Sequence, residues 1–216
     1  MQAARRLVRG TLHCVDVGHA RAYGVGGRHF VLWAGVGLDA EVVRRVEDEN
    51  QALKKTMGSV AYAAVGVRSL LEATGTAALL RHDSRRMRLS LLMAVVANVP
   101  LYAGTIEVAP GARIDDGQFD LVTFAGQGPP DTLRYLAGLT AGRGLGGGGE
   151  SALRAHRVSL VAAHPMPVHL DAEPFGHTPF SATIVPGALR LLVPEGAPRT
   201  LFVPPEGEAS AGVSDR

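Results

Sequence analysis

Eight short segments rich in apolar and β-branched residues, bounded by Gly, Pro, Asn and Asp, constrain the fold more than any other feature of this sequence. They do not alternate regularly with helical segments, which disfavours a parallel, doubly wound sheet. We therefore expect an α+β, mainly β chain, an antiparallel β-sandwich with a few helices packed at its edge. The expected strands are residues 29–36, 88–98, 105–109, 119–125, 157–163, 168–171, 181–185 and 189–193.

Three segments have helical character. The clearest is 57–71, because its apolar side chains recur at the i, i+3, i+4, i+7 spacing of one helix face. A second helix is predicted over 39–49. A third is predicted from Asp131 to Ala137, with Asp131 as the N-cap after two prolines, although Asp131 is equally typical of a simple turn.

Composition fits a single domain with a real core, since 46% of the 216 residues are hydrophobic and 19% are charged. The longest apolar stretch, 89–97, is about half of the roughly 20 residues that a membrane-spanning helix needs. No apolar signal segment follows the N-terminal arginines, so we expect a cytoplasmic protein. Cys14 is the single cysteine, which excludes an internal disulfide and gives no basis for a thiolate zinc site.

The net charge of +2 is too small for a general electrostatic grip on nucleic acid, so no nucleic-acid partner is expected. Local clustering matters more than the total. Arginines gather around one expected loop at positions 81, 85, 86 and 88. Such a cluster is either a solvated face or a contact for lipid headgroups or phosphate, which would place the protein peripherally at a membrane.

Several common catalytic motifs are missing. The glycine-rich stretch 142–149 lacks the Gly-Lys-Ser/Thr of a phosphate loop, and the glycines at 24–27 and 35–37 do not match the dinucleotide fingerprint. The sequence contains no His-Glu-x-x-His and no Gly-x-Ser-x-Gly, so a zinc peptidase or a serine hydrolase has no support. The residues from 204 onward have almost no apolar content, which is typical of a disordered tail.

Two acidic groups are more informative. The first is Asp115-Asp116-Gly117, part of a carboxylate-rich segment that ends at Asp120. An Asp-Asp-Gly sequence is most simply a turn, with Asp capping the backbone and Gly at positive φ. Its alternative is a hard-cation site, because carboxylates and backbone carbonyls supply the oxygen ligands that Mg²⁺ prefers.

The second group is His169-Leu170-Asp171-Ala172-Glu173, just before Pro174. If the strand continues through it, His169, Asp171 and Glu173 share one face. The group is then either an ordinary solvated strand end or a general base presented at the rim of the sheet. Spacing alone favours the first interpretation.

Taken in order, these pieces resemble the C-terminal part of the diacylglycerol kinase, sphingosine kinase and YegS-like lipid kinase family. The resemblance covers about residues 3–194 and lies in the order of several motifs rather than in any one of them. The matching stretches are Leu-Val-Arg-Gly-Thr-Leu-His-Cys-Val-Asp-Val-Gly (7–18), Ala-Gly-Val-Gly-Leu-Asp-Ala (34–40), 55–62, Asn98, 109–120, 170–174 and 185–194.

The resemblance implies a β-rich, lipid-binding domain that faces a separate nucleotide-binding domain. It implies that Asp116 holds a structural Mg²⁺ together with the backbone carbonyls of Arg113 and Gln118. Glu173 would accept the proton of a lipid hydroxyl such as that of diacylglycerol while its oxygen attacks the γ-phosphorus of ATP, and Asp171 would orient or tune Glu173. The expected units are 1–20, a remnant of the nucleotide-binding domain and linker, 21–202, the lipid kinase domain, and 203–216, the tail.

The sequence departs from the family at two points. Ala172 stands where the family usually has glycine, which costs roughly 1–2 kcal/mol if that position needs positive φ. The family's phosphate-binding Gly-Gly-Asp-Gly-Thr is absent, so ATP would be bound mostly by a domain that this sequence lacks. We therefore expect the lipid-substrate portion of a lipid kinase, inactive alone. The alternative is a non-catalytic lipid-binding or interaction domain. An apolar face left without its partner domain also predicts homodimers.

Overall fold

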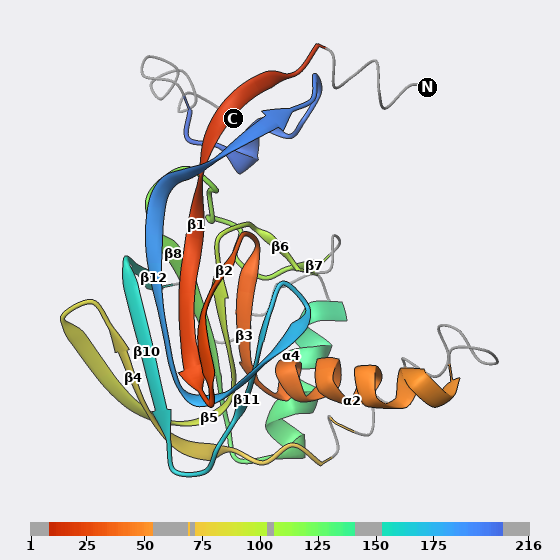
Figure 1. The fold of residues 1–216 in the computed structure, drawn as a ribbon. Helices are drawn as coiled ribbons and strands as arrows, with labels where there is room; N and C mark the ends of the chain where they lie inside the picture. The colour runs from red at the N-terminus through yellow and green to blue at the C-terminus, as the bar shows by residue number, and fades with distance from the viewer. Residues whose placement is uncertain (1–8, 54–68, 70–71, 103–105, 141–152, 205–216) are drawn as a thin grey trace, which may run out of the picture.

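The computed structural model describes residues 9–53, 69, 72–102, 106–140 and 153–204. Figure 1 shows one large, strongly curved sheet with helices on one flank. In chain order, the elements are β1 (Thr11–Tyr23), β2 (Val25–Phe30), β3 (Trp33–Gly37), α2 (Leu38–Leu53), β4 (Thr76–His82), β5 (Arg85–Ala97), β6 (Leu101–Tyr102), β7 (Ile106–Glu107), β8 (Phe119–Ala125), α4 (Pro129–Thr140), β9 (Leu153–Ala155), β10 (Arg157–Ala162), β11 (Pro167–Leu170), β12 (Glu173–Val193) and the 3₁₀ turn η1 (Arg199–Leu201).

The main sheet is antiparallel and closes on itself. Its strand order is β10-β4-β5-β3-β11-β12-β1-β2, and β10 also pairs with β12, which joins the two sides of a barrel-like sheet. Strands β8 and β9 extend it from β5. The predicted α+β, mainly β architecture with antiparallel strands and few helices is confirmed.

Two apolar clusters fill the molecule. Inside the closed sheet, the rings of Phe30 and Phe119 stack 5.5 Å apart among fully buried leucines of β4, β10 and β11. A second cluster lies beneath α4, where the Tyr135 ring meets Phe124 edge-on at 5.0 Å and its hydroxyl donates to the Ala125 carbonyl. Each fully buried large apolar side chain stabilises the fold by about 1.5–3 kcal/mol.

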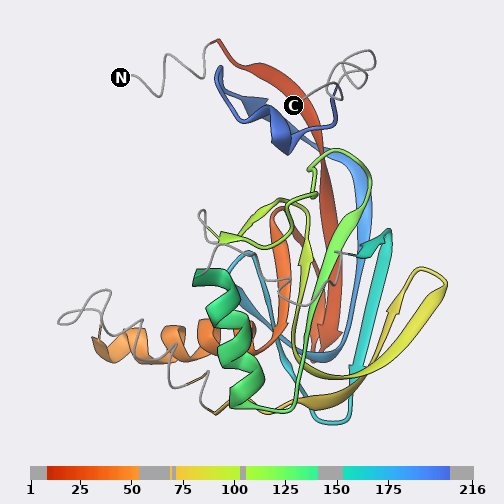
Figure 2. The same cartoon turned by 180° about the vertical axis from the view of Figure 1, so that it is seen from behind.

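Helices α2 and α4 lie on one flank of the sheet, away from β4 and β10 (Figure 1, Figure 2). Helix α2 confirms the prediction for 39–49. Helix α4 begins at Pro129, where a proline suits the first helical turn, so the prediction of Asp131 as the N-cap is wrong. The Asp131 carboxylate instead accepts the Gln127 N–H from inside the first turn. The predicted helix over 57–71, apart from residue 69, the glycine-rich stretch 142–149 and nearly all of the predicted tail lie outside the described residues.

Several strand predictions match the structure and three differ from it, including segment 105–109, of which only Ile106–Glu107 (β7) is described as a strand. Strands β8, β10 and β11 match their predicted segments closely. Segment 29–36 is two strands, β2 and β3, separated by a bend at Val31 and Leu32. Segments 181–185 and 189–193 are one strand, β12, because Pro186 and Gly187 form a register shift opposite β1 and not a turn.

Strand β1 is absent from the predicted strands, as are β4, β6 and β9. Polar residues interrupt its apolar pattern, including Asp16, which is nevertheless 2% exposed. Strand β1 pairs with β12 over almost its whole length, and the paired ends form an arm that extends beyond the closed sheet (Figure 1). The arm carries exposed apolar side chains, among them Leu12, Leu191 and Leu192.

Candidate functional site

The second acidic group forms a tight hairpin between β11 and β12. Leu170 and Glu173 are cross-strand partners, so only Asp171 and Ala172 form the loop. Both have positive φ, 49° and 67°, which is the requirement of a type I′ turn. The expectation that His169, Asp171 and Glu173 share one strand face is therefore wrong, because the chain reverses between them. His169 is fully buried, whereas the Glu173 side chain is 73% exposed.

The Asp171 carboxylate fixes the bend between β2 and β3. Its Oδ2 accepts the Val31 N–H at 2.8 Å, and its Oδ1 accepts the N–H groups of Leu32 and Trp33 at 2.9 and 3.1 Å. The Asp171 N–H in turn donates to the Trp33 carbonyl at 3.0 Å. Three hydrogen bonds to a charged acceptor make this a strong local anchor. Through these hydrogen bonds to backbone groups, Asp171 fixes the hairpin on which Glu173 lies.

A buried His–Asp pair anchors the other side of the hairpin. The Nε2 atom of His169 lies 2.5 Å from Oδ2 of Asp39, in the first turn of α2, and the Ala172 N–H donates to His169 Nδ1 at 3.2 Å. Because Nδ1 accepts a hydrogen bond, we assign the ring N–H to Nε2, which donates a hydrogen bond to Asp39 Oδ2. The pair therefore connects the start of α2 to the turn.

Gly35 makes the close approach of this pair possible. A Cβ atom at position 35 would overlap both His169 Nε2 and Asp39 Oδ2. Two residues later, Gly37 has a φ of +91°, which turns the chain from β3 into α2. In the stretch 34–40, Gly35 thus leaves the space for the His169–Asp39 contact, and Gly37 allows the turn that brings Asp39 to it. The sequence does not reveal the pairing of Asp39 with His169, because no spacing rule connects residues 130 positions apart.

Glu173 makes only weak contacts. One of its carboxylate oxygens lies 3.3 Å from the Arg28 guanidinium, which also packs 5.0 Å from the centre of the Phe175 ring. Both side chains of the ion pair are exposed, at 73% for Glu173 and 38% for Arg28, and such pairs contribute little to stability. The backbone of the hairpin is therefore held from two sides, while the Glu173 carboxylate stays accessible to a substrate.

The first acidic group forms a half-buried turn. Gly117 has a φ of +74° and donates its N–H to Asp16 Oδ2 at 2.6 Å, while the other Asp16 oxygen accepts the Gly187 N–H at 2.7 Å. Asp116 Oδ1 accepts the Gln118 N–H at 3.0 Å. The turn interpretation of Asp-Asp-Gly is therefore confirmed.

The Asp116 carboxylate also contacts a cation. Its side chain is 8% exposed, and its Oδ2 pairs with the guanidinium of Arg154 on β9. The Arg113 side chain points to the C-terminal segment, where it donates to the carbonyls of Thr200 and Phe202. A nearly buried carboxylate with a guanidinium as its counter-ion fits a position that binds a positive charge, and Mg²⁺ could take the place of Arg154 there. No cluster of three or more metal-binding side chains occurs within the described part of the chain.

Asp120, at the start of β8, is a buried carboxylate of a different kind. It is 3% exposed, and its Oδ2 has no hydrogen-bond partner among the described residues. Burial raises the pKa of Asp120 to about 6. An unpaired carboxylate so close in sequence to Asp116 carries a desolvation cost that a proton relieves.

Asn98 connects the two acidic groups. It is fully buried, and its Nδ2 donates to the Val31 carbonyl at 2.8 Å and to the Asp16 carbonyl at 3.0 Å. Val31 belongs to the bend held by Asp171, and Asp16 holds the turn that carries Asp116. The structure thus joins the predicted groups through a chain of hydrogen bonds between side chains and backbone groups.

A cavity of about 200 Å³ lies at the start of α2. It is lined by Gly37, Met166 and Leu92 and by the ion-paired side chains of Arg45 and Glu72, whose atoms lie 2.8 Å apart. The cavity therefore adjoins the same helix start that supports His169. Among the described residues, no helix is long and apolar enough to cross a membrane.

Comparisons with known proteins agree with this architecture. Residues 33–193 match the model of the YegS C-terminal NAD kinase beta sandwich-like domain. The chain is 29% identical over 197 residues to a "Probable lipid kinase YegS-like" of Pseudomonas fluorescens, covering 91% of this chain and 62% of that protein. It is 24% identical over 179 residues to a "Diacylglycerol kinase" of Bacillus subtilis, covering 83% and 56%.

Solved structures share the fold. The crystal structure of a diacylglycerol kinase from Bacillus anthracis str. Sterne aligns with a TM-score of 0.55 at 16% identity, covering 90% of this chain and 58% of its own. Another structure from that strain aligns with a TM-score of 0.68 at 18% identity and covers 90% and 61%. The chain spans about three fifths of the length of these relatives. With its family-model match over residues 33–193, the chain belongs to the YegS-like lipid kinase family, of which it holds the C-terminal β-sandwich-like domain.

Proposed function

We propose that the chain is the lipid-substrate portion of an ATP-dependent lipid kinase, with diacylglycerol or a similar lipid alcohol as acceptor and Glu173 as the proton acceptor. The observation that carries this proposal is the hairpin of Glu173. Its backbone is fixed by Asp171 and by the His169–Asp39 pair, yet its carboxylate is 73% exposed. A rigidly placed, accessible carboxylate is what general-base catalysis at a domain rim requires.

The reaction balances with one base. The Glu173 carboxylate takes the proton of the lipid hydroxyl, the hydroxyl oxygen forms a bond to the γ-phosphorus of ATP, and the bond to the β-phosphate oxygen breaks to release ADP. Arg28, 3.3 Å from Glu173, holds the carboxylate until the substrate arrives. Asp171 acts as a positioning residue, because its oxygens are taken up by the β2–β3 bend.

Mg²⁺ belongs to the proposal at Asp116. Asp116 and the backbone carbonyls of Arg113 and Gln118 would hold it, and the ion would neutralise the buried Asp116 carboxylate in place of Arg154. ATP would be held mainly by a second, nucleotide-binding domain. The exposed apolar side chains of the arm, such as Leu12 and Leu192, support a partner surface there, since contiguous apolar patches seldom stay in water.

The experiment is a transfer assay on the product of the native gene, with radiolabelled ATP and diacylglycerol in detergent micelles. We expect Glu173→Gln to lower kcat by about 10²–10⁴-fold without loss of lipid binding. Glu195→Gln, a change of another exposed glutamate, is the matched control and should leave kcat unchanged.

Two outcomes would contradict the proposal. Near-normal kcat in Glu173→Gln would remove Glu173 as the base. Lipid binding without any phosphate transfer by the unchanged native product would instead support the alternative, a non-catalytic lipid-binding domain. Sedimentation of the same product tests the predicted homodimer separately.

A further inference from the structure

The outer wall of the closed sheet beside β4 carries a regular array of arginines. In β4 and β10, the side chains of Leu80 and Leu160 point into the core, so the alternate positions face outward. Arg81 is paired with Ser159 of β10 on one side and with Arg86 of β5 on the other. Two residues before Arg81 in β4, and on the same face, Leu79 is paired with Val161 of β10 and with Arg88 of β5.

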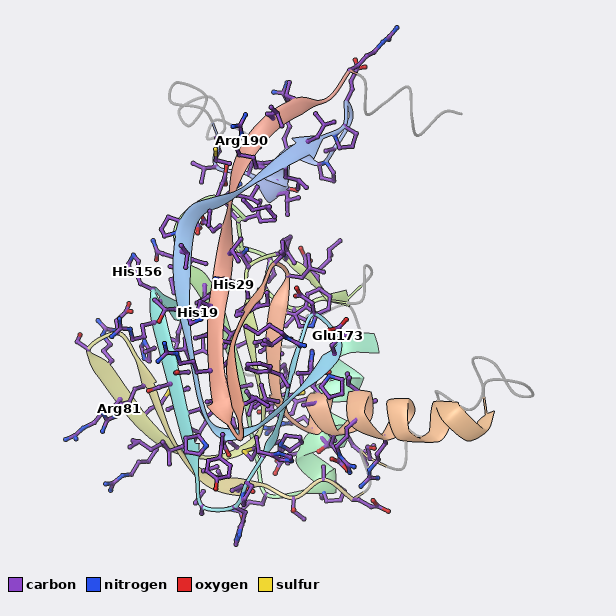
Figure 3. All side chains as sticks on the ribbon, viewed as in Figure 1. His19, His29, Arg81, His156, Glu173 and Arg190 are labelled. Carbon is purple, nitrogen blue, oxygen red and sulfur yellow. The ribbon has the colours of Figure 1, made fainter. Side chains whose placement is uncertain are left out.

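The same outward face continues across β12 to β1. Ser159 pairs with Ser181 of β12, and Ser181 pairs with Arg21 of β1. Arg157 of β10 pairs with Thr183 on that face. We call this surface the arginine face, and it comprises the exposed residues Arg21, Arg81, Arg86, Arg88 and Arg157. Figure 3 shows Arg81 on the side of the sheet that α2 and α4 leave uncovered.

The arginine face lacks internal neutralisation. The outward positions of these strands hold no acidic residue, and Asp83, at the β4–β5 turn, accepts hydrogen bonds from the backbone N–H groups of His156 and Arg157. No side-chain hydrogen bond or ion pair of the five arginines occurs within the described residues. By contrast, Arg44 and Arg45 on α2 both pair with Glu41.

Placing two arginines directly opposite each other, as Arg81 and Arg86 are, works against the stability of a sheet. A surface that keeps such an arrangement without internal partners is suited to an external anion. Exposed aliphatic side chains lie between the charges, with Val161 50% exposed beside the partly buried Leu79. Arginines around an aliphatic centre suit a lipid interface, where both headgroup phosphates and acyl chains are met.

We propose that the arginine face docks on an anionic phospholipid membrane. The inference deepens the proposed function and rests on it for its biological purpose, because a kinase of a membrane lipid has to reach the bilayer. The electrostatic attraction itself needs only this chain. It can therefore be tested without any kinase activity, and failure of one proposal leaves the other standing.

The test is sedimentation of the full chain with vesicles of phosphatidylcholine mixed with phosphatidylglycerol, and with vesicles of phosphatidylcholine alone. We expect binding to the anionic vesicles only, weakening as salt rises. Each arginine near an anionic surface strengthens binding about fivefold, so Arg81→Gln/Arg86→Gln/Arg88→Gln should weaken it about 100-fold. The triple variant should melt no lower than the unchanged chain, because these side chains have no ion-pair partner to lose.

The matched control is Arg9→Gln/Arg134→Gln/Arg190→Gln, which removes the same charge from the arm and from α4 (Figure 3 labels Arg190 on the arm). It should change vesicle binding by less than about threefold. The single reversal Arg88→Glu serves if the triple variant folds poorly, with an expected loss of about 25-fold. Equal weakening by both triple variants, equal binding to neutral vesicles, or tighter binding to a DNA duplex than to anionic vesicles would each overturn the proposal.

Discussion

Replacing Ala172 by glycine should stabilise the protein. Ala172 has a φ of 67°, a left-handed conformation that costs a residue with a Cβ atom roughly 1–2 kcal/mol and costs glycine nothing. Glycine also makes the unfolded chain freer, which takes back about 0.4–1 kcal/mol. The net expectation is an increase of about 0.5–1 kcal/mol in the free energy of unfolding, or about 1–4 °C in Tm for a chain of this size. The resulting Asp-Gly pair is also the preferred sequence of a type I′ turn.

The assay is urea unfolding followed by circular dichroism, with Ala77→Gly as the matched control. Ala77 is exposed on β4 and its φ is not positive, so the same chemical change should lower the free energy of unfolding by about 0.5–1 kcal/mol. The two variants should therefore shift the midpoint in opposite directions. If Ala172→Gly is destabilised as much as Ala77→Gly, Ala172 does not have the strained left-handed conformation.

Three further changes test the supports of the site. In the same urea titration, Gly35→Ala should lower the free energy of unfolding by about 2–4 kcal/mol, because the added Cβ atom would separate His169 from Asp39. The control Gly26→Ala should change it by less than about 0.5 kcal/mol, because a Cβ atom at position 26 meets no atom within 4 Å. Asp171→Asn should cost about 1.5–3 kcal/mol in thermal unfolding, since an amide group would face backbone N–H donors of the bend; an unchanged Tm would contradict this. The pKa of Asp120 is about 6 in the folded chain and 3.8 in the unfolded chain, so in metal-free buffer its contribution to the free energy of unfolding should fall as the pH rises from about 4 to 6. Asp120→Asn should abolish this fall and raise the free energy of unfolding by about 1–3 kcal/mol at pH 7.5, and parallel pH profiles for the two proteins would refute the prediction.

The sequence predicts the class of fold well and the ends of its strands less well. Strand β8 is buried over most of its length, and its prediction agrees with the structure. Period-two alternation is clean in β10, where one face is buried, and there too the prediction agrees with the structure. It fails in β1, because Asp16 and two histidines break the apolar pattern although the strand lies in the sheet. It also fails at Pro186 and Gly187, which resemble a turn in the sequence and are a register shift that Asp16 supports through the Gly187 N–H.

The candidate site is predictable in its residues and not in their arrangement. Asp116, Asp171 and Glu173 stand out as acidic residues beside turn residues, but local spacing suggests a common strand face for the second group. The actual geometry depends on backbone groups far away, at Val31 and Trp33, and on Asp39 at the start of α2. A buried polar side chain finds partners wherever the fold leaves backbone groups unpaired, and that information is not local in the sequence.

These arrangements give each carboxylate a different task. Asp171 and Asp16 are used up by backbone N–H groups and hold a bend and a turn, while Asn98 fastens the two together. Among the described residues, the Glu173 carboxylate pairs only with the exposed Arg28, at an energetic benefit of at most about 1 kcal/mol. A substrate hydroxyl can therefore displace Arg28 at little cost, whereas moving the backbone of Glu173 would break the buried anchors on both sides of its turn. The backbone of this site is thus rigid, whereas the Glu173 carboxylate, which the proposed proton transfer needs, can exchange Arg28 for a substrate.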